Sequence, residues 1–308
     1  GGKTWKYDAL RAPGVVNSNA KIWGQKTDDG RFATVYNPSE YRWPLAVSTS
    51  DDGLRYTDLL LVNGEISPMR FGGNYKSYGP QYIRGILEGN GNPPGDNMWL
   101  TYSMNKEDIW VAKVPVPVKS TVNEDANEVF SQMQDGKELE KWNLFSPDWA
   151  RTQIEKAPNG EKALALHDKD PYDYAKAERV IPAATKTKID FTVIPAQDDK
   201  SNLQIEFTDE KGQAAVRLIV ADNKEMQLKA GYRNFGLAEY EANKAYHISL
   251  TLDVSSRPYT ISVNGKEKGT KIFFAPVHHI NRVVFRTGDV RRFPDADTPT
   301  DQDYDLKN

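Results

Sequence analysis

The sequence predicts an all-β protein in which the last blades of a β-propeller precede a jelly-roll β-sandwich. Short runs of alternating apolar and polar residues recur along most of the chain, as in half-buried strands. Turns rich in Gly, Asn, Asp and Pro separate these runs. Only residues 120–145 carry a helical pattern. There, Val129, Phe130 and Met133 lie near helical spacing, so we expect a short helix within residues 125–141.

The composition excludes several classes of protein. A chain of 308 residues suggests two domains with sizeable cores. Lys and Arg are scattered among acids and the net charge is -3, which argues against a nucleic-acid partner. No apolar run reaches the roughly 18 residues of a membrane span. The chain has no Cys, so disulfides, Cys-zinc sites and a Cys nucleophile are excluded.

No cofactor and no metal site is expected from the sequence. The four His residues lie in the second half of the chain and lack a zinc-binding spacing; they are His167, His247, His278 and His279. Neither a phosphate loop nor a serine nucleophile elbow is present.

The chain divides into three predicted parts: propeller blades in residues 1–118, a linker with the short helix in 119–145, and the sandwich in 146–308. We expect the strands of one blade at residues 21–26, 32–37, 44–48 and 56–63, and those of the next at 81–87, 98–103 and 109–114. Residues 88–96 are too rich in Gly, Asn and Pro for a strand and predict a long loop. Residues 114–118, Val-Pro-Val-Pro-Val, predict an extended exit from the domain.

A tight turn is expected in residues 49–56, which fit the pattern [Ser/Thr]-x-Asp-x-Gly-x-x-aromatic. Asp51 is expected to accept backbone N–H bonds and Gly53 to adopt a positive φ. The Thr49 side chain is expected to hydrogen-bond at the start of the turn. An ordinary Asp-Gly hairpin is the alternative.

Residues 1–5, Gly-Gly-Lys-Thr-Trp, match the tail of a second such turn about fifty residues earlier, a plausible blade period. We therefore expect this chain to be the C-terminal portion of a longer polypeptide. The alternative is that the glycines remain from a tag. Two blades cannot close a ring, so the expected partner is the N-terminal propeller portion of the same protein.

The second domain alternates apolar and polar residues in many short segments. They lie at residues 188–194, 203–208, 215–220, 246–252, 259–263 and 282–286. This pattern predicts a β-sandwich, and the later segments resemble concanavalin- or laminin-G-like jelly rolls. The acidic residues 295–305 predict an exposed tail, with a calcium loop as the alternative.

Three motifs resemble sialidase-superfamily propellers. Residues 49–56 resemble the Asp-box turn of these proteins, and residues 78–86 and 99–109 resemble their last blade. The resemblance implies an exported glycan-degrading protein, secreted or periplasmic, with a carbohydrate substrate. In this family an Arg clamps the carboxylate of the sugar and a Tyr acts as nucleophile. The sequence departs from the family because the Phe-Arg-Ile-Pro motif, the Glu partner of the Tyr and the acid/base Asp are not identifiable.

The resemblance implies Arg42 and Tyr78 as the catalytic candidates. Arg42 would bind a carboxylate bidentately, and Tyr78 would act as nucleophile or, in a lyase, as proton donor or acceptor. The candidate substrate-binding residues are Lys76, Gln81, Tyr82, Arg84 and Asn105. The alternatives are a solvated surface Arg42, a packing Tyr78, and an ordinary hairpin at Asn105 and Lys106.

Two functions follow from these residues. The first is an enzyme that cleaves terminal acidic-sugar linkages by hydrolysis or elimination. The second is a non-catalytic carbohydrate-binding protein. Substitution of Arg42 and Tyr78 distinguishes them, because an enzyme should lose turnover by orders of magnitude and a binding protein should only bind more weakly. A protein-interaction propeller is a weaker third reading.

Overall fold

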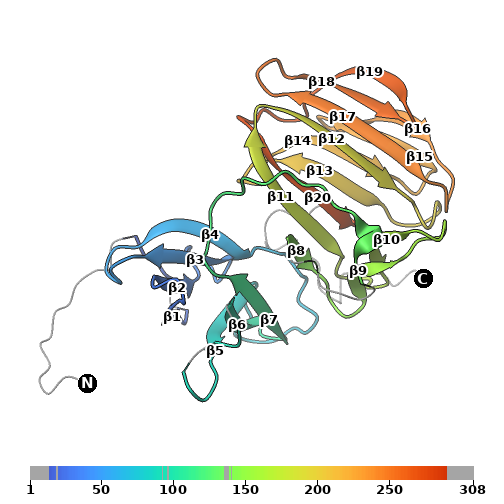
Figure 1. The fold of residues 1–308 in the computed structure, drawn as a ribbon. Coiled ribbons are helices and arrows are strands. Elements are labelled where there is room, and N and C mark those ends of the chain that lie inside the picture. The colour runs from blue at the N-terminus through green and yellow to red at the C-terminus, as the bar shows by residue number, and fades with distance from the viewer. Residues whose placement is uncertain are drawn as a thin grey trace, which may run out of the picture. The chain divides into compact units, whose positions relative to one another are not determined.

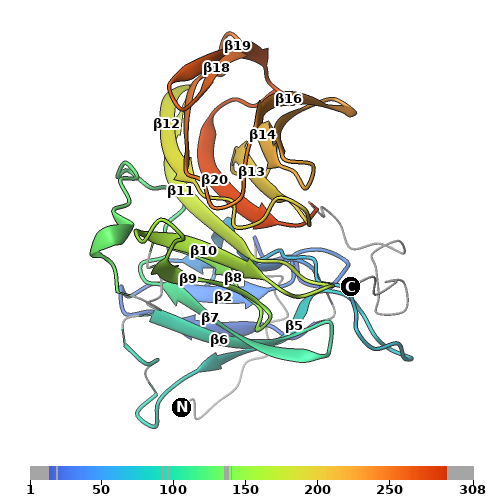
Figure 2. The ribbon, with the colours of Figure 1, turned by 90° about the vertical axis from the view of Figure 1, so that its right-hand side faces the viewer.

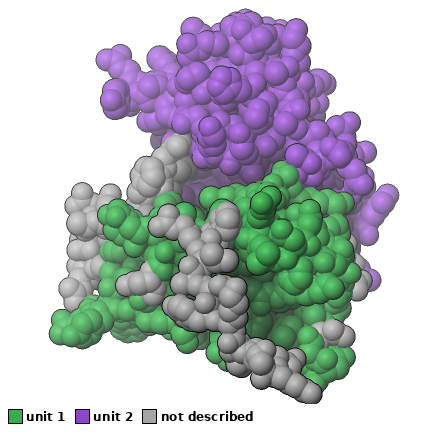
Figure 3. All heavy atoms as spheres, turned by 90° about the vertical axis from the view of Figure 1, so that its left-hand side faces the viewer, with its two compact units in different colours: residues 1–120, 291–308 green, residues 121–290 purple. Residues whose placement is uncertain are grey.

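The computed structural model describes residues 14–289 except 19, 92, 96, 135–138 and 140. In the described part, twenty strands and a single 3-10 turn make up the regular structure, which confirms the predicted all-β class (Figure 1). The chain forms two compact units, coloured in Figure 3. Unit 1 contains residues 1–120 and 291–308, and unit 2 contains residues 121–290. The expectations for residues 1–5 and 295–305 lie outside the described residues.

Unit 1 contains two antiparallel sheets. The first has the order β1-β2-β3-β4 and consists of β1 (Trp23–Lys26), β2 (Phe32–Tyr36), β3 (Leu45–Ser50) and β4 (Thr57–Asn63). The second has the order β5-β6-β7 and consists of β5 (Pro80–Ile86), β6 (Asn97–Met104) and β7 (Asp108–Pro115). Each sheet is a meander, because strands that follow one another in the chain are also neighbours in the sheet.

A single hydrophobic core joins the two sheets of unit 1. Its buried members are Ala33, Val35, Leu45, Val47, Ile83, Met98, Leu100, Tyr102 and Met104. Gly85 of β5 permits the closest approach, since a Cβ there would stand 2.2 Å from the indole of Trp23 in β1. The two sheets therefore pack as one body around side chains that alternate inward along each strand.

The turn after β3 uses a different acid from the one expected. Asp52, not Asp51, accepts the backbone N–H groups of Leu54 and Arg55, both at 2.8 Å. These bonds and one from the Ser50 hydroxyl lower the pKa of Asp52. Asp51 is instead largely exposed and pairs with Arg31 at 2.8 Å. Only Asp51 fits the sequence pattern, but the adjacent Asp52 carries the same carboxylate, and the backbone direction decides which of the two points into the turn.

Gly53 does adopt the expected positive φ, at 74°. Its N–H donates to the Ser50 hydroxyl at 2.9 Å, which takes the role expected of Thr49. The whole set of side-chain bonds is thus shifted by one residue relative to the prediction.

The expected helix within residues 125–141 is also different in the structure. Among the described residues of this stretch, the only helical element is the 3-10 turn η1 (Phe130–Gln132). None of its residues is buried, and no side chain caps it. Without a buried face, the spacing of apolar residues does not stabilise a helix, because packing supplies most helical stability.

Unit 2 is a β-sandwich with two main sheets, which Figure 2 shows as curved layers facing one another. The larger has the order β16-β15-β14-β13-β20-β11-β8. Its strands are β16 (Arg233–Glu239), β15 (Glu225–Ala230), β14 (Ala214–Val220), β13 (Leu203–Thr208), β20 (Ile280–Thr287), β11 (Lys176–Ala184) and β8 (Trp142–Phe145).

The smaller sheet has the order β12-β17-β18-β19 and consists of β12 (Lys186–Val193), β17 (Tyr246–Asp253), β18 (Pro258–Val263) and β19 (Lys266–Ile272). A separate two-stranded sheet consists of β9 (Ala150–Lys156) and β10 (Lys162–Asp168). Strand β8 belongs to the sandwich, although the sequence places residues 142–145 in the linker.

The core of unit 2 lies between the two main sheets. Ile205, Phe207 and Leu218 face it from the larger sheet, and Ile248 and Leu250 face it from the smaller one. Because side chains alternate along a strand, the opposite face of the larger sheet is left to the polar residues between these positions.

No helix in the described part of the chain is long and apolar enough to cross a membrane.

Candidate functional site

The loop between β2 and β3 brings Arg42 against the start of β5. Asn37, directly after β2, is buried and donates through Nδ2 to the carbonyl oxygens of Pro44 and Pro80, each at 2.9 Å. Gly79 has a φ of 98°, and a Cβ there would lie 2.2 Å from the Arg42 carbonyl oxygen. Only glycine therefore permits this approach of the Arg42 backbone to β5.

Gln81 in β5 orients the Arg42 guanidinium. The Gln81 side chain is buried, and its Nε2 donates to the Ser77 carbonyl oxygen at 2.8 Å. Its Oε1 accepts hydrogen bonds from Arg42 Nη1 at 2.9 Å and from the Ser77 hydroxyl at 3.0 Å. Gln81 accepts one N–H group of Arg42 and the Tyr82 phenol accepts another, which leaves the remaining N–H groups of the guanidinium for a ligand.

Tyr82 follows Gln81 at an irregular point in β5. The pairing of β5 with β6 shifts register between Gln81 and Arg84, and Tyr82 has a φ of 59°. A bulge re-aims the side chain that it carries, and a positive φ at a bulky residue is a strained conformation that clusters at functional sites. The Tyr82 side chain is 40% exposed.

Three cations surround the Tyr82 ring. The Arg42 Cζ lies 5.3 Å from the ring centroid, Lys21 Nζ 5.9 Å and Lys106 Nζ 6.0 Å. The hydrogen bond from Arg42 is the main cause that lowers the pKa of the Tyr82 phenol below its ordinary 10.0, and the charge of Lys106 acts in the same direction. None of the three cations pairs with an acid among the described residues. The surroundings of Tyr82 therefore favour an anion.

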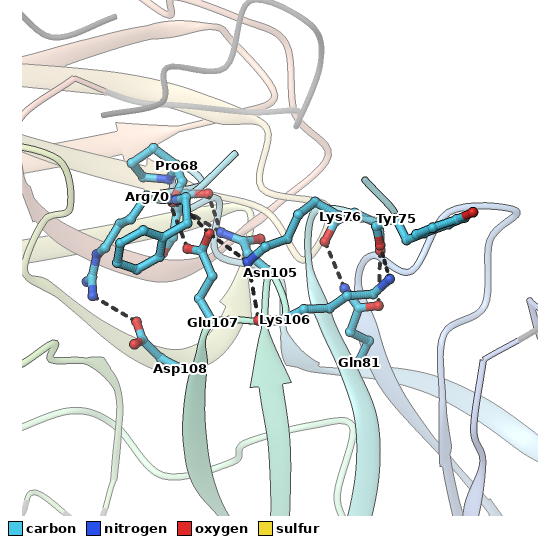
Figure 4. Close-up of polar contacts among 12 residues, drawn as sticks. Pro68, Arg70, Tyr75, Lys76, Gln81, Asn105, Lys106, Glu107 and Asp108 are labelled. Carbon is cyan, nitrogen blue, oxygen red and sulfur yellow. Dashed lines mark hydrogen bonds and ion pairs between the residues drawn. The ribbon is translucent and has the colours of Figure 1, made fainter. Parts of the chain in front are cut away.

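Next to this group, Glu107 fastens the segment of residues 70–76 (Figure 4). The Glu107 side chain is 4% exposed and accepts the N–H groups of Arg70 and Phe71 at 3.0 and 2.9 Å. Lys76 Nζ lies 3.1 Å from the same carboxylate, so its charge is neutralised there. Arg70 also pairs with Asp108 at 3.0 Å. Lys76, predicted as a sugar ligand, thus has a structural ion pair.

Asn105 lies in the hairpin between β6 and β7. Asn105 and Lys106 have φ values of 54° and 58°, as in a two-residue hairpin turn, which is the alternative reading of these residues. The Asn105 side chain is buried. Its Oδ1 accepts the Gly79 N–H at 2.8 Å, and its Nδ2 donates to the carbonyl oxygens of Ser67 and Pro68 at 2.9 and 3.2 Å. This side chain holds backbone together and has no free group for a sugar.

Tyr78 and Arg84, the two remaining candidates, lie on either side of Tyr82 in the chain. Tyr78 is half-buried just before β5, and Arg84 is exposed within β5. Of the seven residues predicted from the sequence, the structure thus brings Arg42, Gln81 and Tyr82 into direct contact with one another.

The sequence prediction missed Lys21 and Glu107. Lys21 comes shortly before β1 and is distant in sequence from Tyr82, so no spacing pattern reveals it. Glu107 sits in an Asn-Lys-Glu-Asp hairpin whose charges look solvated. No group of three or more potential metal ligands occurs among the residues that the structure describes.

Comparisons with known proteins point to sialidases. The family model described as "Sialidase-like, CBM domain" matches residues 142–302. A solved structure titled "Sialidase" is 52% identical with a TM-score of 0.90, and the match covers 100% of this chain and 28% of that chain. This chain therefore spans little more than a quarter of that sialidase. The search of curated proteins found no match.

Two further solved structures share only 12% identity with this chain. A Bacillus licheniformis β-glucanase has a TM-score of 0.36, with 50% of this chain and 81% of that chain covered. The Trypanosoma rangeli sialidase in complex with the inhibitor DANA has a TM-score of 0.28, with coverages of 89% and 52%. Neither likeness is close enough to support an argument.

Proposed function

Because the chain belongs to the sialidase-like, CBM domain family, we propose that this protein is a glycan-degrading enzyme that acts on terminal acidic-sugar linkages. Its relation to sialidases gives it a role in glycan processing. The observation that carries the narrower proposal is the group of Lys21, Arg42 and Lys106 around the Tyr82 ring.

Arg42 is the proposed ligand of the sugar carboxylate. A guanidinium forms two parallel N–H···O bonds with a carboxylate, a geometry that a lysine cannot supply. Gln81 is the positioning residue, because its buried amide holds one edge of the guanidinium. Lys21 and Lys106 add positive charge without acidic partners in the described part of the chain.

Tyr82 is the proposed reactive phenol, in preference to Tyr78. The cations that lower its pKa make the phenolate available nearer to neutral pH, which a nucleophile or a proton acceptor requires. In hydrolysis, the phenolate oxygen would bond to the anomeric carbon as the glycosidic C–O bond breaks, and water would later release the sugar. In elimination, the phenolate would instead remove the proton from the ring carbon next to the carboxylate. The C–H electron pair would form a C=C bond as the C–O bond on the neighbouring carbon breaks, and the leaving oxygen would take a proton from water.

Turnover on glycosides with a terminal acidic sugar tests this assignment. We expect Tyr82→Phe to lower kcat/KM by roughly 10²–10⁴-fold, because removal of a positioned acid–base or nucleophilic group has effects of this size. Tyr41→Phe is the matched control, since Tyr41 is an exposed tyrosine of the same unit. Equal losses in Tyr78→Phe and none in Tyr82→Phe would transfer the role to Tyr78.

A non-catalytic carbohydrate-binding protein is the second candidate function. It is favoured by the family description, which names a CBM domain over residues 142–302. Wild-type protein that binds acidic-sugar glycans but never turns them over would establish this alternative.

Export to the periplasm or the medium, and assembly with an N-terminal propeller portion, are also part of the proposal. They are supported by the relation to a sialidase whose chain is several times longer. Cell fractionation with an antibody against this chain tests both, because it reports the compartment and the size of the polypeptide.

A further inference from the structure

Unit 2 carries a hollow on the polar face of its larger sheet, away from the core. The hollow has a volume of about 420 Å³ and lies over β13, β14, β15 and β16. Its floor is built by Gln204, Ile219 and Gln227. The size suits a ligand of one or two sugar rings, because small-molecule sites begin at roughly 300 Å³.

Strand pairing places the floor residues side by side. Gln204 of β13 is opposite Ile219 of β14, Ile219 is opposite Gln227 of β15, and Gln227 is opposite Gly236 of β16. Opposed residues in a sheet share one face, so these side chains form a single row across four strands. At Gly236 the row has no side chain, and the Glu225 carboxylate lies over it.

Gln204 supplies an independent sign of a ligand. This side chain is 5% exposed, and its Oε1 has no hydrogen-bond partner in the protein. Its Nε2 donates to Asn202 Oδ1 at 2.8 Å, which fixes the direction of the amide. A buried acceptor without a donor is costly, and a hydroxyl donor in the hollow would satisfy it.

Acids outnumber cations around the hollow. Arg217 is held by Glu206, with Nε and Nη2 at 2.8 and 2.7 Å from the same carboxylate oxygen. Lys229 is opposed by Asp222 and Asp289, which also line the hollow. A carboxylate ligand would meet these aspartates, so the excess of acids favours an uncharged ligand over an anionic one.

Amide side chains dominate the lining. Gln204, Gln227, Asn202, Asn223 and Asn234 each offer both donors and acceptors, which matches the paired donor and acceptor character of sugar hydroxyls. No aromatic residue lines the hollow among the described residues, so a sugar would be held by its hydroxyl groups without a stacking platform. From these observations we infer that the hollow is a second glycan site, specific for a neutral, hydroxyl-rich sugar.

This site does not depend on the proposed chemistry at Tyr82. Calorimetric titration of the full chain with galactose, arabinose, rhamnose, xylose and their short oligosaccharides tests it, with galacturonic acid as the charged comparison. At least one neutral sugar should bind. Gln204→Met and Gln227→Ala should each weaken that binding by about tenfold, the loss expected for one to two hydrogen bonds.

The matched control is Gln197→Ala, which removes an exposed glutamine of the same unit that bonds only the Lys200 carbonyl. Gln197→Ala and Arg42→Ala should leave the binding unchanged, and thermal unfolding should show that Gln227→Ala is folded. The inference is overturned if no neutral sugar binds, if Gln227→Ala binds as wild type does, or if galacturonic acid binds this hollow more tightly than every neutral sugar. Loss of turnover on acidic-sugar glycosides, without loss of neutral-sugar binding, would not contradict the inference.

Discussion

The Tyr82 region of unit 1 and the hollow of unit 2 differ in how their charged side chains are paired. Around Tyr82, three cations lack acidic partners in the described part of the chain, which favours an anion. In the hollow of unit 2, the cations Arg217 and Lys229 are matched by acids, and amides provide the contacts. Under the two proposals above, an acidic sugar and a neutral sugar would therefore bind at separate surfaces of the protein.

The two regions also differ in backbone regularity. The Tyr82 region depends on a positive φ, a bulge and the close approach at Gly79. Across the hollow, β13, β14 and β15 pair in register at Gln204, Ile219 and Gln227, and a register shift lies at its edge, where β15 pairs with β16. Irregular backbone concentrates functional groups from separate loops, but it tolerates substitution poorly. Regular strands expose a row of side chains that can be exchanged one at a time.

Within this comparison of the two regions, the largest effect is expected from removing Arg42, the proposed carboxylate ligand of unit 1. Arg42→Ala should lower kcat/KM for an acidic-sugar glycoside by roughly 10²–10³-fold, because the charge-assisted bidentate contact with the sugar carboxylate is lost. The matched control is Arg55→Ala, another arginine of unit 1 that is exposed. A second substrate, in which the sugar carboxylate is converted to an amide, tests the role of the charge. The role of Arg42 is contradicted if Arg42→Ala lowers kcat/KM as much for the amide as for the acid.

The next largest effect concerns the close approach at Gly79. Gly79→Ala should lower the free energy of unfolding of unit 1 by roughly 2–4 kcal/mol, since φ strain and a clash with the Arg42 carbonyl oxygen add. Gly30→Ala has a similar φ, 84°, but open space around the Cβ, so it should cost only about 1 kcal/mol. Urea unfolding followed by Trp fluorescence measures both free energies. Equal losses of stability in the two variants would show that the contact between Gly79 and the Arg42 carbonyl oxygen does not restrict the side chain at position 79.

Ionic strength should change ligand affinity in unit 1 but not in the hollow of unit 2, and this effect should be smaller than those of the substitutions above. Between about 0.05 M and 0.5 M NaCl, binding of an acidic sugar in unit 1 should weaken several-fold, because salt screens exposed charges. Binding of a neutral sugar in the hollow should stay nearly constant. A strong salt dependence of the neutral sugar would mean that charge, not amide bonding, holds it.

The smallest effect is the titration of Tyr82. Its folded-state pKa lies below the ordinary 10.0, so ionised Tyr82 contributes stability that is fully present above the unfolded pKa and is lost as pH falls through the folded pKa. Arg42→Ala should move the ionisation to higher pH. The difference in phenolate absorbance between wild type and Tyr82→Phe, repeated in the Arg42→Ala background, measures it. Identical titration curves in the two backgrounds would show that Arg42 does not lower the pKa of Tyr82.

Much of the strand pattern could be predicted from alternation. The strands expected at residues 81–87, 98–103 and 109–114 correspond to β5, β6 and β7 within a few residues. Alternation works because each of these strands buries one face, as β6 does with Met98, Leu100 and Tyr102. The helix expected within residues 125–141 failed because periodicity cannot show whether a buried face exists.

The candidate site was predictable only in part. Resemblance and strand alternation point to Arg42, Gln81 and Tyr82, but they rank Tyr78 above Tyr82 because Tyr78 lies at the start of the innermost strand of the expected blade. The bulge in β5 re-aims Tyr82 among the cations, and bulges leave little trace in sequence. The row of Gln204, Ile219 and Gln227 across the hollow could not be predicted, because sequence alone does not show that strand pairing aligns these residues.

The sequence by itself determined the all-β class, most strands and the resemblance to sialidases, because alternation and turn chemistry are local properties. Tertiary structure decided which aspartate caps the turn after β3, which tyrosine meets Arg42, and that Gln204 keeps an unpaired acceptor over a hollow. These outcomes depend on backbone direction and strand register, which bring residues together from distant parts of the chain and are set by packing of the whole sheet.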